Sequence, residues 1–87
     1  MAYRIVVTRR AEKDLAELPK AVVRRIDTKI LSLADAPRPV EAVKLKGADA
    51  LYRIRVGDYR IVYEVQDDVV VIVIVRVGHR REVYRGL

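Results

Sequence analysis

The chain of 87 residues contains no cysteine and only one histidine. It can therefore form no disulfide bond, and it offers no thiolate as a metal ligand or nucleophile. The usual zinc sites are excluded as well, because they need several cysteine or histidine ligands. No apolar run approaches the roughly 18 residues of a membrane-spanning helix, and residues 1–10 lack the core of a secretory signal. We expect a cytoplasmic protein that needs no metal or other cofactor.

Apolar residues make up 52% of the chain and charged residues 34%, which is typical of a globular protein rather than a disordered one. A chain this short has room for one hydrophobic core, so we expect residues 1–87 to form a single domain. The net charge of +6 favours an anionic partner, such as nucleic acid, an acidic protein or a membrane surface. Arginine outnumbers lysine 13 to 5, a bias that suits forked recognition of phosphate.

The first half of the chain predicts a strand and two helices. Residues 3–7 are aromatic and β-branched, as in a short strand. Thr8 can cap a helix that starts at the next residue, and Pro19 interrupts the apolar face of that helix. A second amphipathic helix starts at about Lys20, and the proline-containing segment 36–39 ends it.

The second half predicts three consecutive antiparallel strands after a connector. The first two strands alternate, and the third is an almost unbroken β-branched run, which indicates a strand that is central or covered on both faces. The predicted order is connector 40–50, strand 51–56, turn 57–58, strand 59–66, turn 67–68, strand 69–77 and a polar tail 78–87. The fold class is therefore α+β: an N-terminal strand, a helical hairpin and a three-stranded antiparallel meander, with the helices packed on one side of the sheet.

Three arginines fall on one face of the predicted hairpin. If residues 57–58 form a two-residue loop, Arg55 lies opposite Arg60 and Arg53 shares their face, while the other face is apolar. An equally short loop at the next turn would place Arg60 beside Val75. Opposed like charges are destabilising by up to about 1 kcal/mol, so the cluster makes sense if an anion such as phosphate bridges it. In the alternative interpretation the arginines form a solvated face that discourages edge pairing.

Other polar residues are weaker candidates. His79 could act as a general base near neutral pH, but a lone loop histidine is more often a polar surface residue. Tyr84 could present its phenol to a substrate, or pack its ring as most tyrosines do. Lys44 and Lys46 flank a leucine that we expect to be buried, and they are secondary candidates for phosphate contact.

A series of short motifs runs along the chain: Met1-Ala2-Tyr3, Ala36-Pro37-Arg38, Lys44-Leu45-Lys46-Gly47, Leu51-Tyr52-Arg53-Ile54-Arg55, Asp58-Tyr59-Arg60-Ile61-Val62-Tyr63 and Val77-Gly78-His79-Arg80-Arg81-Glu82-Val83-Tyr84. This series resembles the RelE/ParE toxin superfamily, and most closely the RelE-type mRNA interferases. The resemblance spans essentially the whole chain. The middle strand motif is shared across the superfamily, whereas the arginine and tyrosine of the tail are more specific to the nuclease branch.

The resemblance implies a metal-independent, ribosome-dependent endoribonuclease toxin of a type II toxin–antitoxin system. Such an enzyme cleaves mRNA by attack of the 2′-hydroxyl, leaving a 2′,3′-cyclic phosphate. The implied partners are a cognate RelB-like antitoxin, the ribosome and mRNA; promoter DNA is contacted only through the antitoxin complex, and no membrane is involved. A basic groove left open in the free toxin should attract an acidic or amphipathic antitoxin segment, in the form of a helix along an apolar flank.

The resemblance also assigns roles by position. Arg60 resembles the arginine that grips the scissile phosphate, Arg80 the one that stabilises the developing charge, and Tyr84 the tyrosine that orients the substrate. Arg53 and Arg55 stand where the best-known members carry lysines. Because arginine stays protonated, either Arg55 acts only electrostatically or another group, such as Tyr84 or His79, takes the proton. The candidate catalytic residues are Arg55, Arg60, Arg80 and Tyr84, and the candidate RNA or phosphate contacts are Lys44, Lys46, Arg53, His79 and Arg81.

Two alternatives share the fold. A ParE-like toxin inhibits DNA gyrase by binding and performs no cleavage, although the presence of both Arg80 and Tyr84 argues against it. An inactive family member would act only in antitoxin binding and autoregulation.

Overall fold

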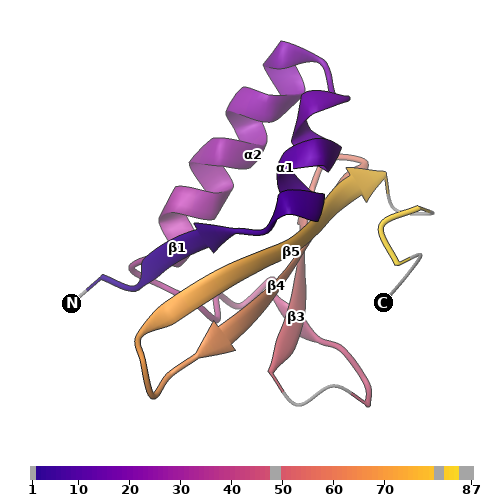
Figure 1. The fold of residues 1–87 in the computed structure, drawn as a ribbon. Helices are drawn as coiled ribbons and strands as arrows, with labels where there is room; N and C mark the ends of the chain where they lie inside the picture. Colours follow the sequence, from indigo (N-terminus) through magenta and orange to yellow (C-terminus); the bar gives the residue numbers. More distant parts are fainter. Residues whose placement is uncertain (1, 48–49, 80–81, 85–87) are drawn as a thin grey trace.

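The computed structural model describes residues 2–47, 50–79 and 82–84, and it places two helices on one face of a five-stranded sheet (Figure 1). The elements are β1 (Arg4–Val7), α1 (Arg9–Ala16), α2 (Lys20–Leu33), β2 (Val43–Lys44), β3 (Leu51–Val56), β4 (Tyr59–Gln66) and β5 (Val71–His79). The strands lie in the order β1-β5-β4-β3-β2. β1 runs parallel to β5, and all other neighbours are antiparallel. The α+β class and the one-sided helical layer are as predicted.

Most predicted elements occur within a few residues of their expected bounds. Both helices start where predicted; α1 ends at Ala16, and α2 ends at Leu33. β5 lies between β1 and β4, so the prediction of a central third strand is confirmed. The connector predicted at 40–50 contains β2, a two-residue edge strand that sequence analysis missed. Within the described residues, neither helix is long and apolar enough to cross a membrane.

The turn between β4 and β5 differs from the prediction. β4 ends at Gln66 opposite Val71, so the connection has four residues instead of two. Val70 adopts a φ of 56°, a left-handed conformation that is rare for a β-branched residue. The sequence pattern does not predict this conformation. β5 therefore runs to His79, and the first two residues of the predicted polar tail belong to it.

A bulge in β5 changes the cross-strand partners further along. Val62 pairs with Arg76 and Tyr63 with Ile74, which leaves the intervening Val75 without a partner on β4. The prediction that Arg60 lies beside Val75 is therefore wrong. The shifted register places Gly78 opposite Arg60 instead.

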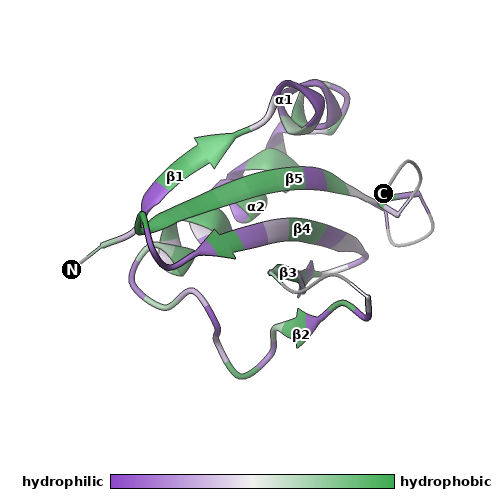
Figure 2. Cartoon of the chain, turned by 60° about the horizontal axis from the view of Figure 1, so that its bottom comes forward, coloured by the Kyte–Doolittle hydropathy of each residue, from purple (hydrophilic) through white to green (hydrophobic). Residues whose placement is uncertain are grey.

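The core lies between the helices and the sheet. Alternate residues of β3 and β4 face the helices, because successive side chains of a strand point to opposite sides. Figure 2 shows β1 and most of β5 as apolar, whereas the helices also carry hydrophilic positions. Each fully buried isoleucine or leucine contributes about 1.5–3 kcal/mol, so this layer holds the helices on the sheet. The buried cluster contains Ala11, Ile26, Ile30, Leu33, Ile54, Val56, Ile61, Tyr63, Val65, Ile72, Ile74 and Val77.

A polar cluster at the opposite end from the β3–β4 turn joins four segments that are distant in the sequence. Arg38, in the loop after α2, donates to both carboxylate oxygens of Asp67 in the β4–β5 turn, at 3.2 and 2.5 Å. The Tyr3 hydroxyl donates to the same carboxylate at 2.6 Å, and the Nε of Arg38 donates to the Tyr52 hydroxyl at 3.0 Å. The hydrogen bonds from Arg38 and then from Tyr3 lower the pKa of Asp67. Nearby, burial raises the pKa of Tyr63 to about 12.

The lowered pKa of Asp67 predicts an acid-dependent loss of stability. Asp67 is normally ionised above about pH 3.9, and a lowered folded-state pKa stabilises the fold above that value. This contribution disappears as the pH falls through the folded-state pKa. Urea unfolding should therefore show wild type more stable than Asp67→Asn at pH 6, with a smaller difference at pH 3. Asp68→Asn is the matched control, because within the described residues the Asp68 side chain accepts a hydrogen bond from the adjacent Val69 amide alone. An Asp67→Asn deficit of the same size at both pH values would contradict this account.

Candidate functional site

Arginine side chains gather on the sheet face opposite to the helices. Arg55 lies directly opposite Arg60, and Arg53 lies opposite Val62 on the same face. The predicted two-residue turn at 57–58 and the register that follows from it are confirmed. The glycine of this turn has a φ of 60°, the left-handed conformation that tight hairpin turns require.

Arg60 is the most buried of the three. Only 6% of its surface is exposed, whereas Arg53 is half-buried and Arg55 is exposed. Among the described residues, no hydrogen bond or ion pair joins the Arg60 side chain to another group. The described residues also contain no fully enclosed side-chain polar atom that lacks a partner, so the Arg60 nitrogens remain reachable from solvent.

The electrostatics of this face favour an anion. A buried charge is costly unless a partner neutralises it, and the cross-strand neighbours of Arg60 are Arg55 and Gly78, which cannot do so. Phosphate oxygens match the fork of a guanidinium group, and two guanidinium groups on adjacent strands can approach one phosphate together. The arrangement can therefore bind an anion and stabilise charge that develops on it.

A fourth arginine on this face was missed by sequence analysis. Arg76 lies opposite Val62 and is 7% exposed. The signal was present, since Arg76 is the one charged residue within an otherwise β-branched run. Its Nε donates to a carboxylate oxygen of Asp14 on α1 at 2.8 Å. Arg76 therefore differs from Arg60 in having an internal counter-ion.

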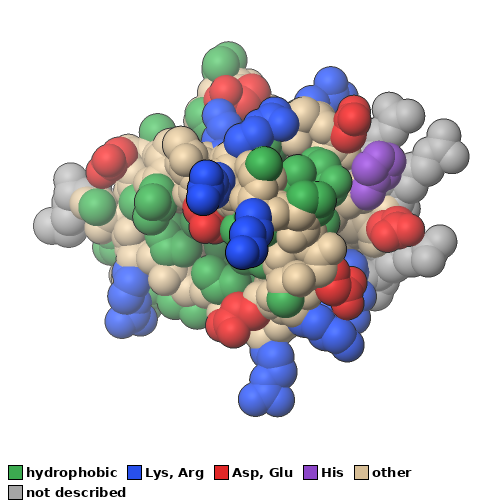
Figure 3. All heavy atoms as spheres, turned by 90° about the horizontal axis from the view of Figure 1, so that it is seen from above, with side chains coloured by type: hydrophobic (Ala, Val, Ile, Leu, Met, Phe, Trp, Pro, Cys, Tyr) green, Lys and Arg blue, Asp and Glu red, His purple; other side chains and the backbone are tan. Residues whose placement is uncertain are grey.

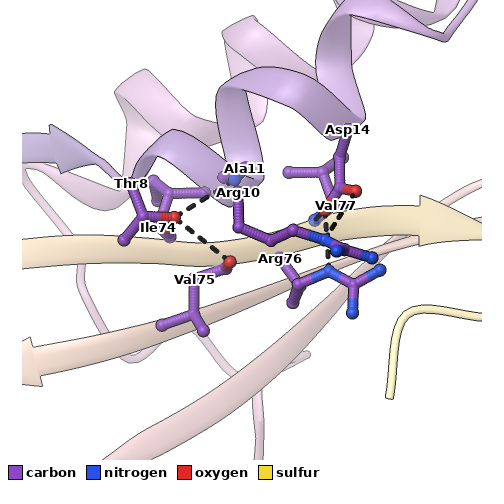
Figure 4. A network of polar contacts seen from close by, with 8 residues as sticks. All are labelled: Thr8, Arg10, Ala11, Asp14, Ile74, Val75, Arg76 and Val77. Atoms are coloured by element: carbon purple, nitrogen blue, oxygen red, sulfur yellow. Dashed lines mark hydrogen bonds and ion pairs between the residues drawn. The ribbon is translucent and has the colours of Figure 1, made fainter. Parts of the chain in front are cut away.

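Helix α1 completes the edge of β5 beyond the end of β1 (Figure 4). The Thr8 hydroxyl caps the helix by accepting from the Ala11 amide at 3.1 Å, and it lies 2.9 Å from the carbonyl oxygen of Ile74. The Asp14 carboxylate accepts from the backbone N–H of Val77 at 3.0 Å. These contacts satisfy backbone groups that no neighbouring strand reaches. They hold the last part of β5, and hence the arginine face, against α1.

Removal of the Asp14 carboxylate should destabilise the fold strongly. Asp14→Ala removes the acceptor of the Val77 amide and one acceptor of Arg76 in a largely buried place, which predicts a loss of about 2–3 kcal/mol of unfolding free energy. Arg10→Ala is the control, since Arg10 also pairs with Asp14, at 3.5 Å, but its side chain is 59% exposed. Its predicted loss is below about 1 kcal/mol. Chemical denaturation measures both, and equal losses in the two variants would contradict the assignment.

His79 lies away from the arginine face. It pairs with Tyr59, which packs against the helix-side core, and the two rings meet edge to face with centroids 6.0 Å apart. Seen from the helical side, His79 lies at one end of the molecule with acidic side chains around it (Figure 3). A cavity of about 240 Å³ next to it is lined by Asp14, Glu17 and Glu82 among others. The same cavity is lined by Arg76 and Gly78 of the arginine face, so it meets that face at the end of β5, where its three carboxylates disfavour phosphate.

The remaining candidates are placed as follows. Lys44 pairs with Tyr52 and so belongs, by register, to the helix side of the sheet; Lys46 is exposed in the following loop. Tyr84 is 38% exposed in the segment after β5. Arg80 and Arg81 lie outside the described residues. In the part of the chain that the structure describes, no group of three or more histidine, aspartate or glutamate side chains could hold a metal ion.

Comparison with known proteins identifies the family. A family model described as the ParE toxin of type II toxin–antitoxin systems, parDE, matches residues 5–84. The chain is 36% identical over 88 residues to the mRNA interferase toxin RelE of Escherichia coli K12, covering 97% of this chain and 92% of that protein. It is 32% identical over 89 residues to the putative toxin RelE1 of Methanocaldococcus jannaschii, covering 99% of both chains.

A solved structure agrees with this relationship. The archaeal RelE–RelB complex from Pyrococcus horikoshii OT3 has a TM-score of 0.81 to this chain at 37% identity, covering 94% of this chain and 99% of that one. The chain therefore belongs to the RelE/ParE superfamily of toxins from type II toxin–antitoxin systems, and its relatives are of the RelE type. The resemblance seen in the sequence motifs is confirmed.

Proposed function

We propose that this chain is an mRNA-cleaving toxin that acts on the ribosome in the cytoplasm, with residues 1–87 working as one domain. The observation that carries the proposal is the buried Arg60, which has no side-chain partner among the described residues and lies directly opposite Arg55 on the face away from the helices. The naming of the Escherichia coli relative as an mRNA interferase supports the same conclusion.

RNA supplies its own nucleophile, the 2′-hydroxyl, so the protein does not need a nucleophilic side chain. The 2′-hydroxyl oxygen forms a bond to the adjacent phosphorus while the bond from phosphorus to the 5′-oxygen breaks. The products are a 2′,3′-cyclic phosphate and a 5′-hydroxyl that takes up a proton. Arg55 and Arg60 hold the phosphate and stabilise the charge that accumulates on its oxygens, with Arg53 as a further contact. The reaction therefore needs no metal ion.

The proton from the 2′-hydroxyl needs an acceptor. Arginine does not release a proton near neutral pH, which excludes Arg53 and Arg55 as general bases. His79 belongs to the helix side of the sheet, whereas the segment that carries Tyr84 covers the arginine face through Val83. We assign the proton transfer to Tyr84, which accepts the 2′-hydroxyl proton as a phenolate and, once it is a phenol, can return a proton to the departing 5′-oxygen. We assign the stabilisation of the developing charge to Arg60 together with Arg80.

Arg60→Ala tests the proposal. On translating ribosomes it should slow mRNA cleavage by about 100-fold or more, the usual effect of removing one preorganised charge-stabilising donor. Arg60→Lys should recover only part of the rate, because an ammonium keeps the charge but lacks the fork. Arg24→Ala, which removes an exposed arginine from α2 on the helical layer, should cleave like wild type.

A measurement of stability separates this role from a structural one. Arg60→Ala removes a like-charge neighbour of Arg55 but also the buried stem of the Arg60 side chain, so we expect it to lower the free energy of unfolding by less than about 1 kcal/mol. Cleavage by Arg60→Ala at the wild-type rate would refute the proposed site.

We further propose that the protein is held inactive by an acidic, amphipathic antitoxin. The related Pyrococcus horikoshii protein was solved as a complex with RelB. In this chain Val6 and Val43 are exposed on the arginine face, and the net charge is +6. An amphipathic segment can cover the valines with its apolar side and meet the arginines with carboxylates.

Co-expression with the product of the adjacent open reading frame tests the partnership. The two proteins should co-purify through gel filtration, and the complex should dissociate more readily as salt is raised, because salt screens the charge component. Failure to co-purify would count against the toxin–antitoxin assignment.

The family model, whose description names ParE toxins, keeps one alternative open. A supercoiling assay with purified gyrase distinguishes the two functions. Inhibition of gyrase with mRNA left intact would favour a ParE-like toxin over the proposed nuclease, and the absence of both activities with tight antitoxin binding would indicate an inactive member.

A further inference from the structure

Two residues on the arginine face are more buried than an uncovered sheet would allow. Val62 is fully buried and Arg60 is 6% exposed, although both point away from the helical layer. Val83, which follows the end of β5, is also fully buried and lies outside the helix-side cluster. The segment after β5 therefore covers this part of the sheet.

The contact of Val83 with the sheet is defined by Gly78. A Cβ atom at Gly78 would lie 4.0 Å from both the Cα and the Cβ of Val83. Since Gly78 pairs with Arg60, that direction is the direction in which Arg60 points. Val83 thus lies over the arginine face beside Arg60, and the absence of a side chain at Gly78 makes room for it.

A tight turn fixes the segment in this place. The amides of Glu82 and Val83 both donate to the carbonyl oxygen of His79, at 2.9 and 3.1 Å. The turn reverses the chain at the end of β5 and directs it back over the sheet. Tyr84 follows Val83 directly and keeps 38% of its surface exposed.

We infer that Val83 is a positioning residue: by packing against Gly78 it anchors the segment after β5 and holds Tyr84 beside the buried Arg60. This inference deepens the proposed nuclease function and rests on it. Of residues 82–84, Val83 alone is buried, and loss of this anchor frees several backbone and side-chain torsions. Tyr84 would then sample many orientations, most of them unproductive for proton transfer.

Val83→Ala should reduce the single-turnover cleavage rate by about 10- to 100-fold, with a smaller change in the substrate concentration needed for half-saturation. Val83→Ile, which keeps a β-branched apolar side chain, should restore most of the rate. Val71→Ala is the matched control, since Val71 is 7% exposed and pairs with Gln66 at the other end of the same strand, away from the segment. A Val71→Ala rate as low as that of Val83→Ala would show that only general stability is involved.

Substitutions of Gly78 test the same contact from the sheet side. Gly78→Ala should be tolerated, because a Cβ at 4.0 Å from Val83 is in ordinary contact distance. Gly78→Leu should displace Val83 and reproduce the Val83→Ala defect. Full activity of Gly78→Leu would overturn the inference.

A double-mutant cycle connects the anchor to Tyr84. If Val83 acts through Tyr84, then Val83→Ala should slow cleavage in wild type but have little further effect in the Tyr84→Ala background. Fully additive effects would overturn the inference while leaving the proposed nuclease function intact. Absence of cleavage by wild type would instead refute the proposed function.

Hydrogen exchange provides a readout that does not depend on cleavage. The amides of Glu82 and Val83 should be protected in wild type and in Val71→Ala, and should exchange faster in Val83→Ala, since the turn opens without its anchor. Unchanged protection in Val83→Ala would show that the turn holds the segment without Val83, which would overturn the inference whether or not the protein cleaves RNA.

Discussion

The candidate site depends on two arginines that the sheet pairs directly opposite each other on neighbouring strands. Arg55 and Arg60 belong to one hairpin, and their alignment follows from a two-residue turn whose glycine has a φ of 60°. A Cβ at Gly57 would also lie 3.1 Å from the Arg25 guanidinium of α2. Both the left-handed backbone and this close contact therefore favour glycine at position 57. The fold accepts a like-charge pair here, which fits the proposal that an anion binds between the two strands.

The register of this hairpin could be predicted from the sequence, because a two-residue turn between two alternating segments leaves one alignment that buries the apolar side. The following connection could not. Its length depends on a left-handed Val70, and the later alignment depends on a bulge at Val75; both are set by the packing of the whole sheet rather than by local preference. The edge strand β2 was missed because a strand of two residues is too short to show an alternating pattern in the sequence.

The candidate residues likewise divide into those that a local pattern predicts and those that only long-range contacts place. Arg53, Arg55 and Arg60 could be placed on one face by counting along two neighbouring strands. The buried pair of Arg76 with Asp14 spans 62 positions in the sequence and joins a helix to the edge of a strand, a contact that no local pattern reveals. The cover that Val83 provides was missed because a polar tail with a single valine resembles any solvated terminus.

The bulge at Val75 has a consequence for how the strand can vary. On β5 the helix-facing residues are Ile72 and Ile74 before the bulge and Val77 after it, so the inward positions are separated by three residues instead of two. The unpaired Val75 switches which alternate residues of β5 face the helices. Val77 therefore faces the core, and its neighbour Gly78 faces the other side of the sheet beside Arg60. Inserting two residues into this strand would keep the same side chains facing the helices, whereas inserting or deleting one residue would require the bulge to be lost or a second one to form. With the bulge in place, the separation between Ile74 and Gly78 can therefore change only by an even number of residues.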